Sequence, residues 1–136
     1  SSLHTEHGRY VPLAVKIAPD LDDAQIDDIA RIVPACGIDA VIATNTTIDK
    51  SALGASPLAQ EAGGLSGAPV FAPSNRVLKK LADAFAGSLP LIGVGGILSG
   101  GDAKHKLDLG ATAVQVYSGM VYRGPALVKE CLAACR

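Results

Sequence analysis

The sequence has almost no net charge and no long hydrophobic run. Its 136 residues include 12 Lys and Arg against 13 Asp and Glu, so the formal net charge at pH 7 is −1. Neither a nucleic acid nor an anionic membrane surface is an evident partner, because both attract basic patches. No unbroken apolar stretch approaches the ~18 residues of a membrane span, and no cationic leader precedes an apolar run. With 49% hydrophobic residues, we expect an ordinary globular domain.

The sequence also lacks a metal-ligand pattern. Its three cysteines are Cys36, Cys131 and Cys135, and the last two fall one helical turn apart. We interpret them as small helix residues in a reducing cytosol rather than as a disulfide or redox pair. The five aspartates between residues 20 and 28 are interpreted as a helix start and a solvated face. No metal site is predicted.

Four short apolar runs are typical of buried parallel strands. They are rich in β-branched residues and are nearly continuously apolar, as expected for strands that flanking helices bury on both faces. The predicted strands are 13–17, 40–44, 91–95 and 113–117.

Helical patterns alternate with these strands. The first predicted helix is capped by Asp20 or Asp22 and ends before Gly37, and the second opens at Ser74 and ends before Gly87. A short third helix starts at Asp102 and ends near Gly110, and a fourth carries Pro125 in its first turn. The pattern is therefore four βα units in succession.

Four βα units in 136 residues amount to about half of a (β/α)₈ barrel, which takes about 250 residues. The prediction is an α/β fold, a parallel TIM barrel of which this chain covers about the last four βα units. An open doubly wound domain is the alternative, but no G-x-G-x-x-G follows the first strand. Residues 1–10 are polar, lack a starting methionine and are interpreted as a linker or cut end, and residues 11–136 as the C-terminal half of the barrel.

Two glycine-bearing strand exits are the best indication of function. LIGVGG (91–96) and VQVYSG (114–119) follow the last two predicted strands. In such barrels the loops after the last two strands commonly bind phosphate, because glycine lets backbone N–H groups approach an anion closely. A long connection from about Thr46 to Pro73 runs through GGLSG (63–67), and loops of that length are usually functional.

Six motifs in register carry a family resemblance. The motifs are VPLAVKIAPD (11–20), IATNTT (42–47), GGLSG (63–67), IGVGGI (92–97), VQVYSG (114–119) and GPALVKE (124–130). With these motifs, the sequence from Val11 onward resembles the C-terminal half of dihydroorotate dehydrogenase, most closely the quinone-linked, membrane-associated class. The resemblance implies an FMN cofactor, dihydroorotate and orotate as substrate and product, and a role in pyrimidine biosynthesis.

Lys16 is the single residue whose position in the sequence gives the most specific functional prediction. In LAVKI it shares a face with Ala14 and Ala18, so we expect its ammonium to project from the small-residue face near the end of the strand. A lysine there needs an anion or a water-filled site, or it snorkels from the strand end. The resemblance places Lys16 against the flavin, where a fixed cation stabilises negative charge that arrives with hydride.

Thr44, Asn45 and Thr46 leave the second predicted strand together. An asparagine side chain offers both a donor and an acceptor, which suits a pyrimidine edge, although Asn-Thr is also a common turn signal. The resemblance assigns Thr44 to the flavin and Asn45 with Thr46 to the substrate.

The remaining flavin contacts implied by the resemblance are four residues at the glycine-rich exits. They are Gly67, Gly96, Tyr117 and Ser118. Glycine permits close approach of a ligand and a positive φ, and Ser118 adds a hydroxyl. A tight βα turn explains an isolated glycine equally well, but it does not explain three clusters at one end of a sheet.

The sequence offers no catalytic base. The quinone-linked class is expected to use a serine in the N-terminal half, and Ser66 is assigned no catalytic role. The chain alone is therefore expected to be inactive, and to need the N-terminal half or an oligomer as partner. The resemblance also implies a quinone acceptor and a cytoplasmic protein attached peripherally to the inner membrane. The open alternatives are a non-catalytic flavin- or phosphate-binding half-barrel, or another FMN barrel oxidoreductase.

Overall fold

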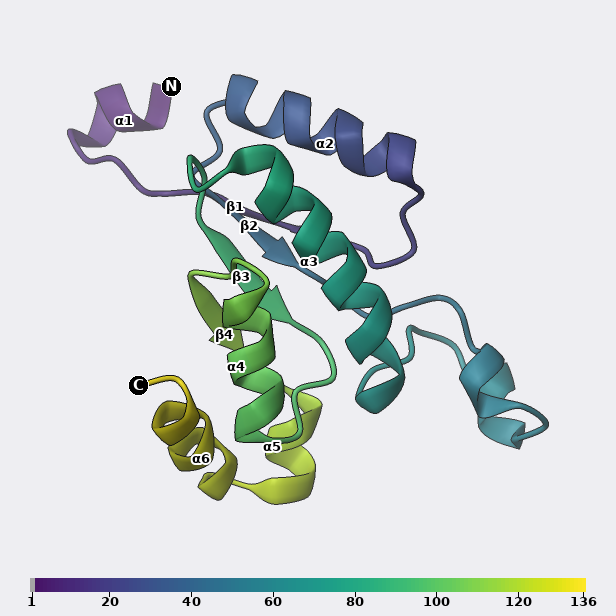
Figure 1. Cartoon of the computed structure of the whole chain (residues 1–136). Helices are drawn as coiled ribbons and strands as arrows, with labels where there is room; N and C mark the ends of the chain where they lie inside the picture. The colour runs from purple at the N-terminus through teal and green to yellow at the C-terminus, as the bar shows by residue number, and fades with distance from the viewer. Residues whose placement is uncertain (1) are drawn as a thin grey trace.

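A four-stranded parallel sheet forms the centre of the chain. The computed structural model describes residues 2–136, with side chains from Thr5 onward (Figure 1). The strands are β1 (Ala14–Ile17), β2 (Ala40–Ala43), β3 (Leu91–Val94) and β4 (Ala113–Gln115). They pair in the order β1-β2-β3-β4, each parallel to the next. All four predicted strands are confirmed, although β4 ends two residues early because Tyr117 leaves the extended conformation, with ψ −79°.

The helices follow the predicted alternation but differ from the prediction in number and in where several of them begin, since the third predicted helix starts at Gly100 and Pro125 is the N-cap of the last helix. They are α1 (Ser2–His7), α2 (Asp23–Ala35), α3 (Phe71–Phe85), α4 (Gly100–Asp108), α5 (Ser118–Arg123) and α6 (Ala126–Ala134). The segment interpreted as a linker or cut end contains α1, and the short α5 was not predicted. Helix α3 begins three residues before Ser74, because a 3₁₀ turn over Ala68–Val70 leads directly into it.

Two neighbouring aspartates after β1 have different roles. Asp22 is the N-cap of α2: its carboxylate accepts from the amide of Gln25 at 2.8 Å, and the Gln25 side chain accepts from the Asp22 amide at 3.0 Å. This reciprocal capping box satisfies two amides that the first helical turn leaves free. Asp20 instead accepts from the Thr47 hydroxyl and, at 3.3 Å, from the amide of Ile48. It therefore ties the exit of β1 to the exit of β2.

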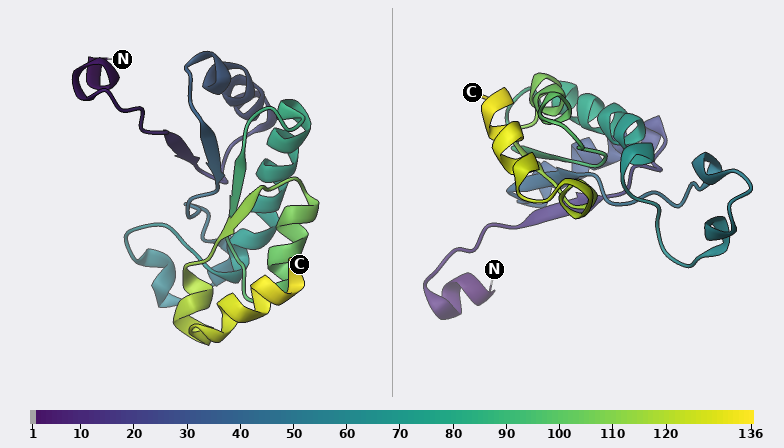
Figure 2. Two further views of the ribbon diagram at one scale, coloured as in Figure 1. Left: turned by 90° about the vertical axis from the view of Figure 1, so that its left-hand side faces the viewer. Right: turned by 90° about the horizontal axis from the view of Figure 1, so that it is seen from below.

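The helices cover one face of the sheet (Figure 2). Helices α2, α3 and α4 lie along the same side, and the main core joins them to the side chains that the strands point outward, including Ile17, Val41 and Leu91. The other face carries Lys16, Ile42 and Ile92, which are exposed or half-buried. The expectation that the strands are buried on both faces is thus met on one face of this chain.

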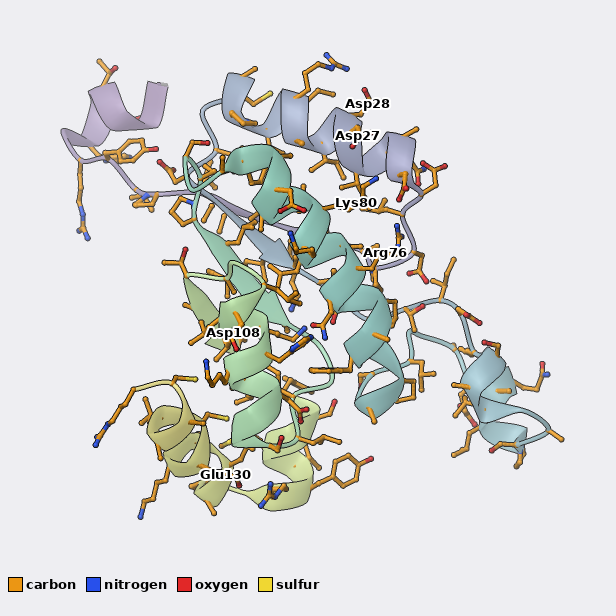
Figure 3. The ribbon with its side chains drawn as sticks, viewed as in Figure 1. Asp27, Asp28, Arg76, Lys80, Asp108 and Glu130 are labelled. Carbon is orange, nitrogen blue, oxygen red and sulfur yellow. The ribbon has the colours of Figure 1, made fainter. Side chains whose placement is uncertain are left out.

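Ion pairs line the seam between α2 and α3. Arg76 binds Asp23 at 2.8 Å, and Lys80 lies 3.0 Å from Asp23 and 3.9 Å from Asp27. Figure 3 shows Lys80 and Arg76 of α3 on the side that faces α2. The Lys80 ammonium is the main cause that lowers the pKa of the Asp23 carboxyl. Because the carboxylates are largely exposed and the cations are partly exposed, the pairs orient the two helices more than they stabilise them.

The long connection between β2 and α3 is ordered as short 3₁₀ turns rather than as a helix. The turns span Ser51–Leu53, Pro57–Gln60 and Ala68–Val70. Thr47 and Leu65 exchange two backbone hydrogen bonds, of 3.0 and 2.8 Å, as an isolated antiparallel bridge. This bridge brings the GGLSG segment back to the exit of β2. Among residues 2–136 no helix has the length and apolar character needed to cross a membrane.

Helices α4 and α6 pack closely at Gly100. The Gly100 amide donates to the Glu130 carboxylate at 2.9 Å, and Arg123 lies 3.0 Å from the same carboxylate. The Gly100 hydrogen bond, followed by the Arg123 charge, lowers the pKa of Glu130. A Cβ on Gly100 would lie 2.8 Å from the Glu130 carbonyl oxygen and 3.0 Å from the Ala134 Cβ. The packing therefore requires glycine here.

We expect Gly100→Ala to lower the free energy of unfolding by about 1–3 kcal/mol, the usual cost of overpacking, because α4 and α6 must move apart. Gly101→Ala is the matched control, since a Cβ there meets only the Ser99 hydroxyl, at 3.6 Å. That control is expected to leave stability unchanged or to raise it by up to about 1 kcal/mol, as alanine favours helix. Urea denaturation measures both, and equal midpoints for the two variants would contradict the packing.

Candidate functional site

A cavity of about 240 Å³ opens at the carboxyl ends of the four strands. All eight residues that the sequence singled out line this cavity. Those assigned to the flavin are Lys16, Thr44, Gly67, Gly96, Tyr117 and Ser118, and those assigned to the substrate are Asn45 and Thr46. The eight come from the ends of β1, β2, β3 and β4 and from the long connection. Parallel pairing in register brings them together, because every strand ends at the same edge.

Lys16 is the only charged residue among those that line the cavity. It is exposed on the sheet face that the helices leave open, and its Nζ lies 3.4 Å from the side-chain oxygen of Gln115 on β4. The two side chains thus approach each other from the first and the last strand. A single cation at the carboxyl edge of the sheet gives the cavity a local positive potential suited to an anionic or electron-accepting ligand.

Backbone hydrogen bonds hold the segment that follows β2, and the side chains of this segment line the cavity. The Thr44 amide donates to Val94 at 3.0 Å and the Asn45 amide donates to Ile17 at 2.7 Å. Thr44 is only 1% exposed and its hydroxyl donates to the Asn45 carbonyl at 3.0 Å. The Asn45 side-chain oxygen accepts from the Thr46 amide at 2.9 Å, so its amide nitrogen is available as a donor.

Glycine at position 64 is what lets the long connection approach Thr46. A Cβ on Gly64 would lie 2.1 Å from the Thr46 hydroxyl oxygen, so no larger residue fits without moving the threonine. Farther along, Gly67 has φ +82°, and Ser66 and Ser118 share a hydrogen bond of 2.9 Å between their hydroxyls. These contacts connect the GGLSG segment to the start of α5 and close one wall of the cavity.

Gly95 and Gly96 form the turn after β3, with φ of +112° and +70°. Within residues 2–136, no hydrogen bond to another protein group is donated by the amide of either residue. Two adjacent free amides beside the Ser118 hydroxyl are a donor set suited to a phosphoryl group. A phosphate-bearing cofactor therefore fits the residues present.

The structure gives a further physical reason why residue 96 is a glycine. A Cβ there would lie 2.5 Å from the Cβ of Phe71 and 2.7 Å from its backbone, so a side chain would collide with the start of α3. The glycine is required by close packing and by its positive φ, in addition to any approach of a ligand.

Several residues of the cavity wall were not assigned to the site from sequence. Gln115 meets Lys16, while Val70, Ile97 and Val116 supply apolar wall. Alternation along β4 could have indicated Gln115, because it shares a face with Ala113. The apolar residues carry no signal that separates them from core. No group of three or more potential metal ligands occurs among the described residues, and no metal was predicted.

Lys106 is a second cation near the site, and the sequence analysis missed it. It lies on α4, is 0% exposed, and donates to the Ser74 hydroxyl at 2.9 Å and to the Asn75 side-chain oxygen at 2.7 Å. Burial lowers the pKa of Lys106 from 10.5 to about 8, and Asp102 acts weakly in the opposite direction. Its position three residues after Ala103 puts Lys106 on the buried face of α4, and this spacing is the one signal in the sequence that could have indicated its burial.

Known proteins resemble this chain along almost its whole length. Residues 3–134 match the family described as dihydroorotate dehydrogenase. A dihydroorotate dehydrogenase (quinone) of Neisseria gonorrhoeae is 68% identical over 134 residues, which are 98% of this chain and 40% of that protein. The protein of the same description in Chromobacterium violaceum is 62% identical over 98% of this chain and 39% of its own length.

Solved structures agree with this match. A crystal structure of DHODH from Eimeria tenella in complex with ferulenol has a TM-score of 0.85 and 39% identity, and the match covers 96% of this chain and 35% of that one. A ligand-free form from the same organism has a TM-score of 0.83. The four βα units are thus part of a TIM barrel, and the chain spans about 40% of the length of the curated relatives it matches. By sequence, fold and the residues gathered at its strand ends, the chain belongs to the dihydroorotate dehydrogenase family.

Proposed function

We propose that this chain supplies the flavin-phosphate site and part of the substrate site of an FMN-dependent enzyme that oxidises dihydroorotate to orotate in pyrimidine biosynthesis. The observation that carries the proposal is that all eight candidate residues line one and the same cavity at the carboxyl ends of the strands. Family membership and 58–68% identity to proteins described as dihydroorotate dehydrogenase (quinone) support the same reaction.

The phosphate half of the site consists of backbone and hydroxyl donors. The free amides of Gly95 and Gly96 and the hydroxyl of Ser118 provide at least three donors to a dianion. Gly67 lies across from Ser118. A Cβ on Gly67 would stand 3.9 Å from the Ser118 Cβ, so glycine leaves the space between the two loops free of a side chain. We propose that these residues, with Tyr117, hold the FMN phosphate and its chain.

The redox half of the site centres on Lys16. When bound, FMN would supply the acceptor for the hydride of dihydroorotate, and this chemistry would bring negative charge to the acceptor. We propose that the Lys16 ammonium lies against the ring and stabilises this charge as it develops, with Gln115 limiting the positions of the lysine side chain. Thr44 contacts the same cofactor from β2.

Asn45 and Thr46 are proposed to bind the pyrimidine. Because the Asn45 oxygen is already occupied by the Thr46 amide, its NH₂ group remains to donate to a ring carbonyl. The Thr46 hydroxyl, wedged against Gly64, adds a second polar contact in a fixed position.

We propose that the catalytic base and the binding site of the electron acceptor lie in the rest of the protein. We propose that the base is a serine in the N-terminal half and that quinone is reduced through N-terminal segments, which would attach the protein peripherally to the inner membrane. The relatives described as quinone enzymes support this acceptor. A non-catalytic flavin-binding half-barrel, alone or as a homo-oligomer, is the alternative that activity measurements distinguish.

A charge placed at Ser118 tests the phosphate site. Ser118→Asp in the full-length protein is expected to weaken FMN binding by roughly tenfold or more, because a carboxylate next to the phosphate dianion repels it. The start of a helix tolerates an acidic residue, so the fold should persist. Ser118→Asn is the matched neutral control of nearly equal volume. Flavin fluorescence titration measures both, and equal FMN affinities for the two variants would remove Ser118 from the phosphate site.

Lys16→Met tests the redox half. Loss of the ammonium is expected to slow flavin reduction by dihydroorotate about 100- to 1000-fold while substrate affinity changes little, because the charge matters most in the transition state. Stopped-flow absorbance of the flavin follows the reduction. Lys50→Met, a lysine outside the cavity, is the control. Unchanged reduction kinetics in Lys16→Met would make Lys16 a structural residue only.

The isolated 136-residue chain tests the assignment of the base. Its inner sheet face is partly exposed and both edge strands, β1 and β4, lack a further partner among the described residues, and such surfaces pair with other chains. We expect the isolated chain to be poorly soluble, or to be stable only as an oligomer or with the N-terminal half, and in no case to turn over dihydroorotate without that half. Light scattering and a dye-reduction assay measure these properties. A compact monomer with activity would disprove the assignment.

A further inference from the structure

Lys106 is buried without a salt-bridge partner among the described residues, and only the more distant Asp102 carboxylate partly offsets its charge. Within the part of the chain that the structure describes, its ammonium forms no salt bridge, and its partners are two neutral oxygens, those of Ser74 and Asn75. The ring of Phe71 takes the third side, with its centre 5.2 Å from Nζ. A buried cation with only neutral partners is costly unless something else compensates it.

The backbone of β3 makes room for this lysine. A Cβ on Gly93 would lie 3.0 Å from the Lys106 Cδ and 3.1 Å from its Cβ, so the stem of the lysine occupies the space of the side chain that Gly93 lacks. The Lys106 side chain thereby extends from α4 along the outer face of the sheet to α3. It ends on the side of β3 opposite to the cavity, one residue layer behind the Gly95–Gly96 turn.

Ser74 connects the lysine to that turn. Its hydroxyl accepts from Lys106 and can donate its own proton to the carbonyl of Phe71 at 3.0 Å or to that of Gly95 at 3.5 Å. Ser74 is 0% exposed, and a Cβ on Gly95 would lie 2.9 Å from its hydroxyl oxygen. The Lys106 ammonium therefore fixes a serine that packs against Gly95, the first of the two residues with free amides.

We propose that Lys106 is a positioning residue for the flavin phosphate: through Ser74 it holds the Gly95–Gly96 turn in its binding conformation, and its charge adds positive potential behind the amides. The inference rests on the proposed function, because it assumes that this turn binds the phosphate. It identifies the bound dianion as the charge that compensates the buried cation.

The proposal predicts a pH dependence. Because burial lowers the pKa of Lys106 to about 8, the lysine loses its charge in mildly alkaline solution. A bound phosphate favours the protonated lysine, so FMN affinity must fall as the pH rises through this pKa, by up to about tenfold if the phosphate raises the pKa by one unit. Among the described residues, Asp102 on α4 is the charged group that acts on Lys106, and His105 of the same helix lies against Phe71. The other charged groups of α3 and α4 are engaged in ion pairs, those of Arg76 and Lys80 with Asp23, Lys79 with Asp83 and Lys104 with Asp108, and β3 contributes only the uncharged Gly93.

The experiment compares FMN with riboflavin, which lacks the phosphate, on the full-length apoprotein between pH 7 and 9. Lys106→Met removes the charge and keeps most of the volume. The expected result is a loss of FMN affinity of roughly tenfold or more at pH 7, no comparable loss for riboflavin, and a flat pH profile. Lys104→Met is the matched control on the exposed side of α4, where Lys104 pairs with Asp108 at 2.7 Å, and it should bind both flavins as the parent does.

Ser74→Ala provides a second variant that keeps the lysine. Ser74→Ala is expected to weaken the binding of FMN more than that of riboflavin. It serves as the test of the proposal if circular dichroism shows that Lys106→Met does not fold. Unchanged FMN affinity and pH profile in a folded Lys106→Met, or unchanged FMN affinity in Ser74→Ala, would overturn this inference alone. A parent protein that binds FMN no better than riboflavin would overturn the phosphate assignment, and this inference with it.

Discussion

The parallel register of four strands is the constraint on which the rest of the structure depends. Ile17, Ala43 and Gly93 are successive partners across the sheet, so β1, β2 and β3 end at the same level. Parallel pairing sends every chain exit to one edge, and helices must return the chain along the other side. The polar residues at the exits therefore meet at one cavity although up to about 100 residues separate Lys16 from Ser118. Every functional contact described above follows from that geometry.

Close backbone approach is the second condition, and glycine is what permits it. Gly64 lets the long connection press on Thr46, Gly93 accommodates the stem of Lys106, and Gly96 packs against the backbone of Phe71. Each of these glycines touches a different side chain, and only Gly96 also needs a positive φ. The glycine content thus has two separate causes, conformation and space. Only the structure separates them, because both look the same in a sequence.

The two faces of the sheet explain why the strands are apolar throughout. The outer face is buried by α2, α3 and α4, while the inner face with Ile42 and Ile92 is open in this chain. Inner-face apolar residues match the packed interior of a complete barrel. The chain spans about 40% of the length of its relatives, and both the exposed inner face and the edge of β1 suit further strands. Lys16 stands on this inner face at the end of its strand, where the barrel interior meets the cavity.

The sequence by itself determined the strand and helix alternation and the half-barrel size, while the resemblance of its motifs to a known family implied the eight residues of the candidate site. The alternation and the size rest on local signals, since short β-branched runs, capping aspartates and glycine-bearing exits act within a few residues. It did not determine the start of α3, the short α5, the contact of Lys16 with Gln115 or the burial of Lys106. The start of α3 follows from the 3₁₀ turn that directly precedes it, whereas the other features have partners far along the chain. Arg123 of α5 bonds to Leu98, 25 residues away, Lys106 bonds to Ser74, 32 residues away, and Lys16 bonds to Gln115, 99 residues away. A lysine on a helix looks exposed until a glycine on the strand behind it makes room, and that pairing exists only in the tertiary structure.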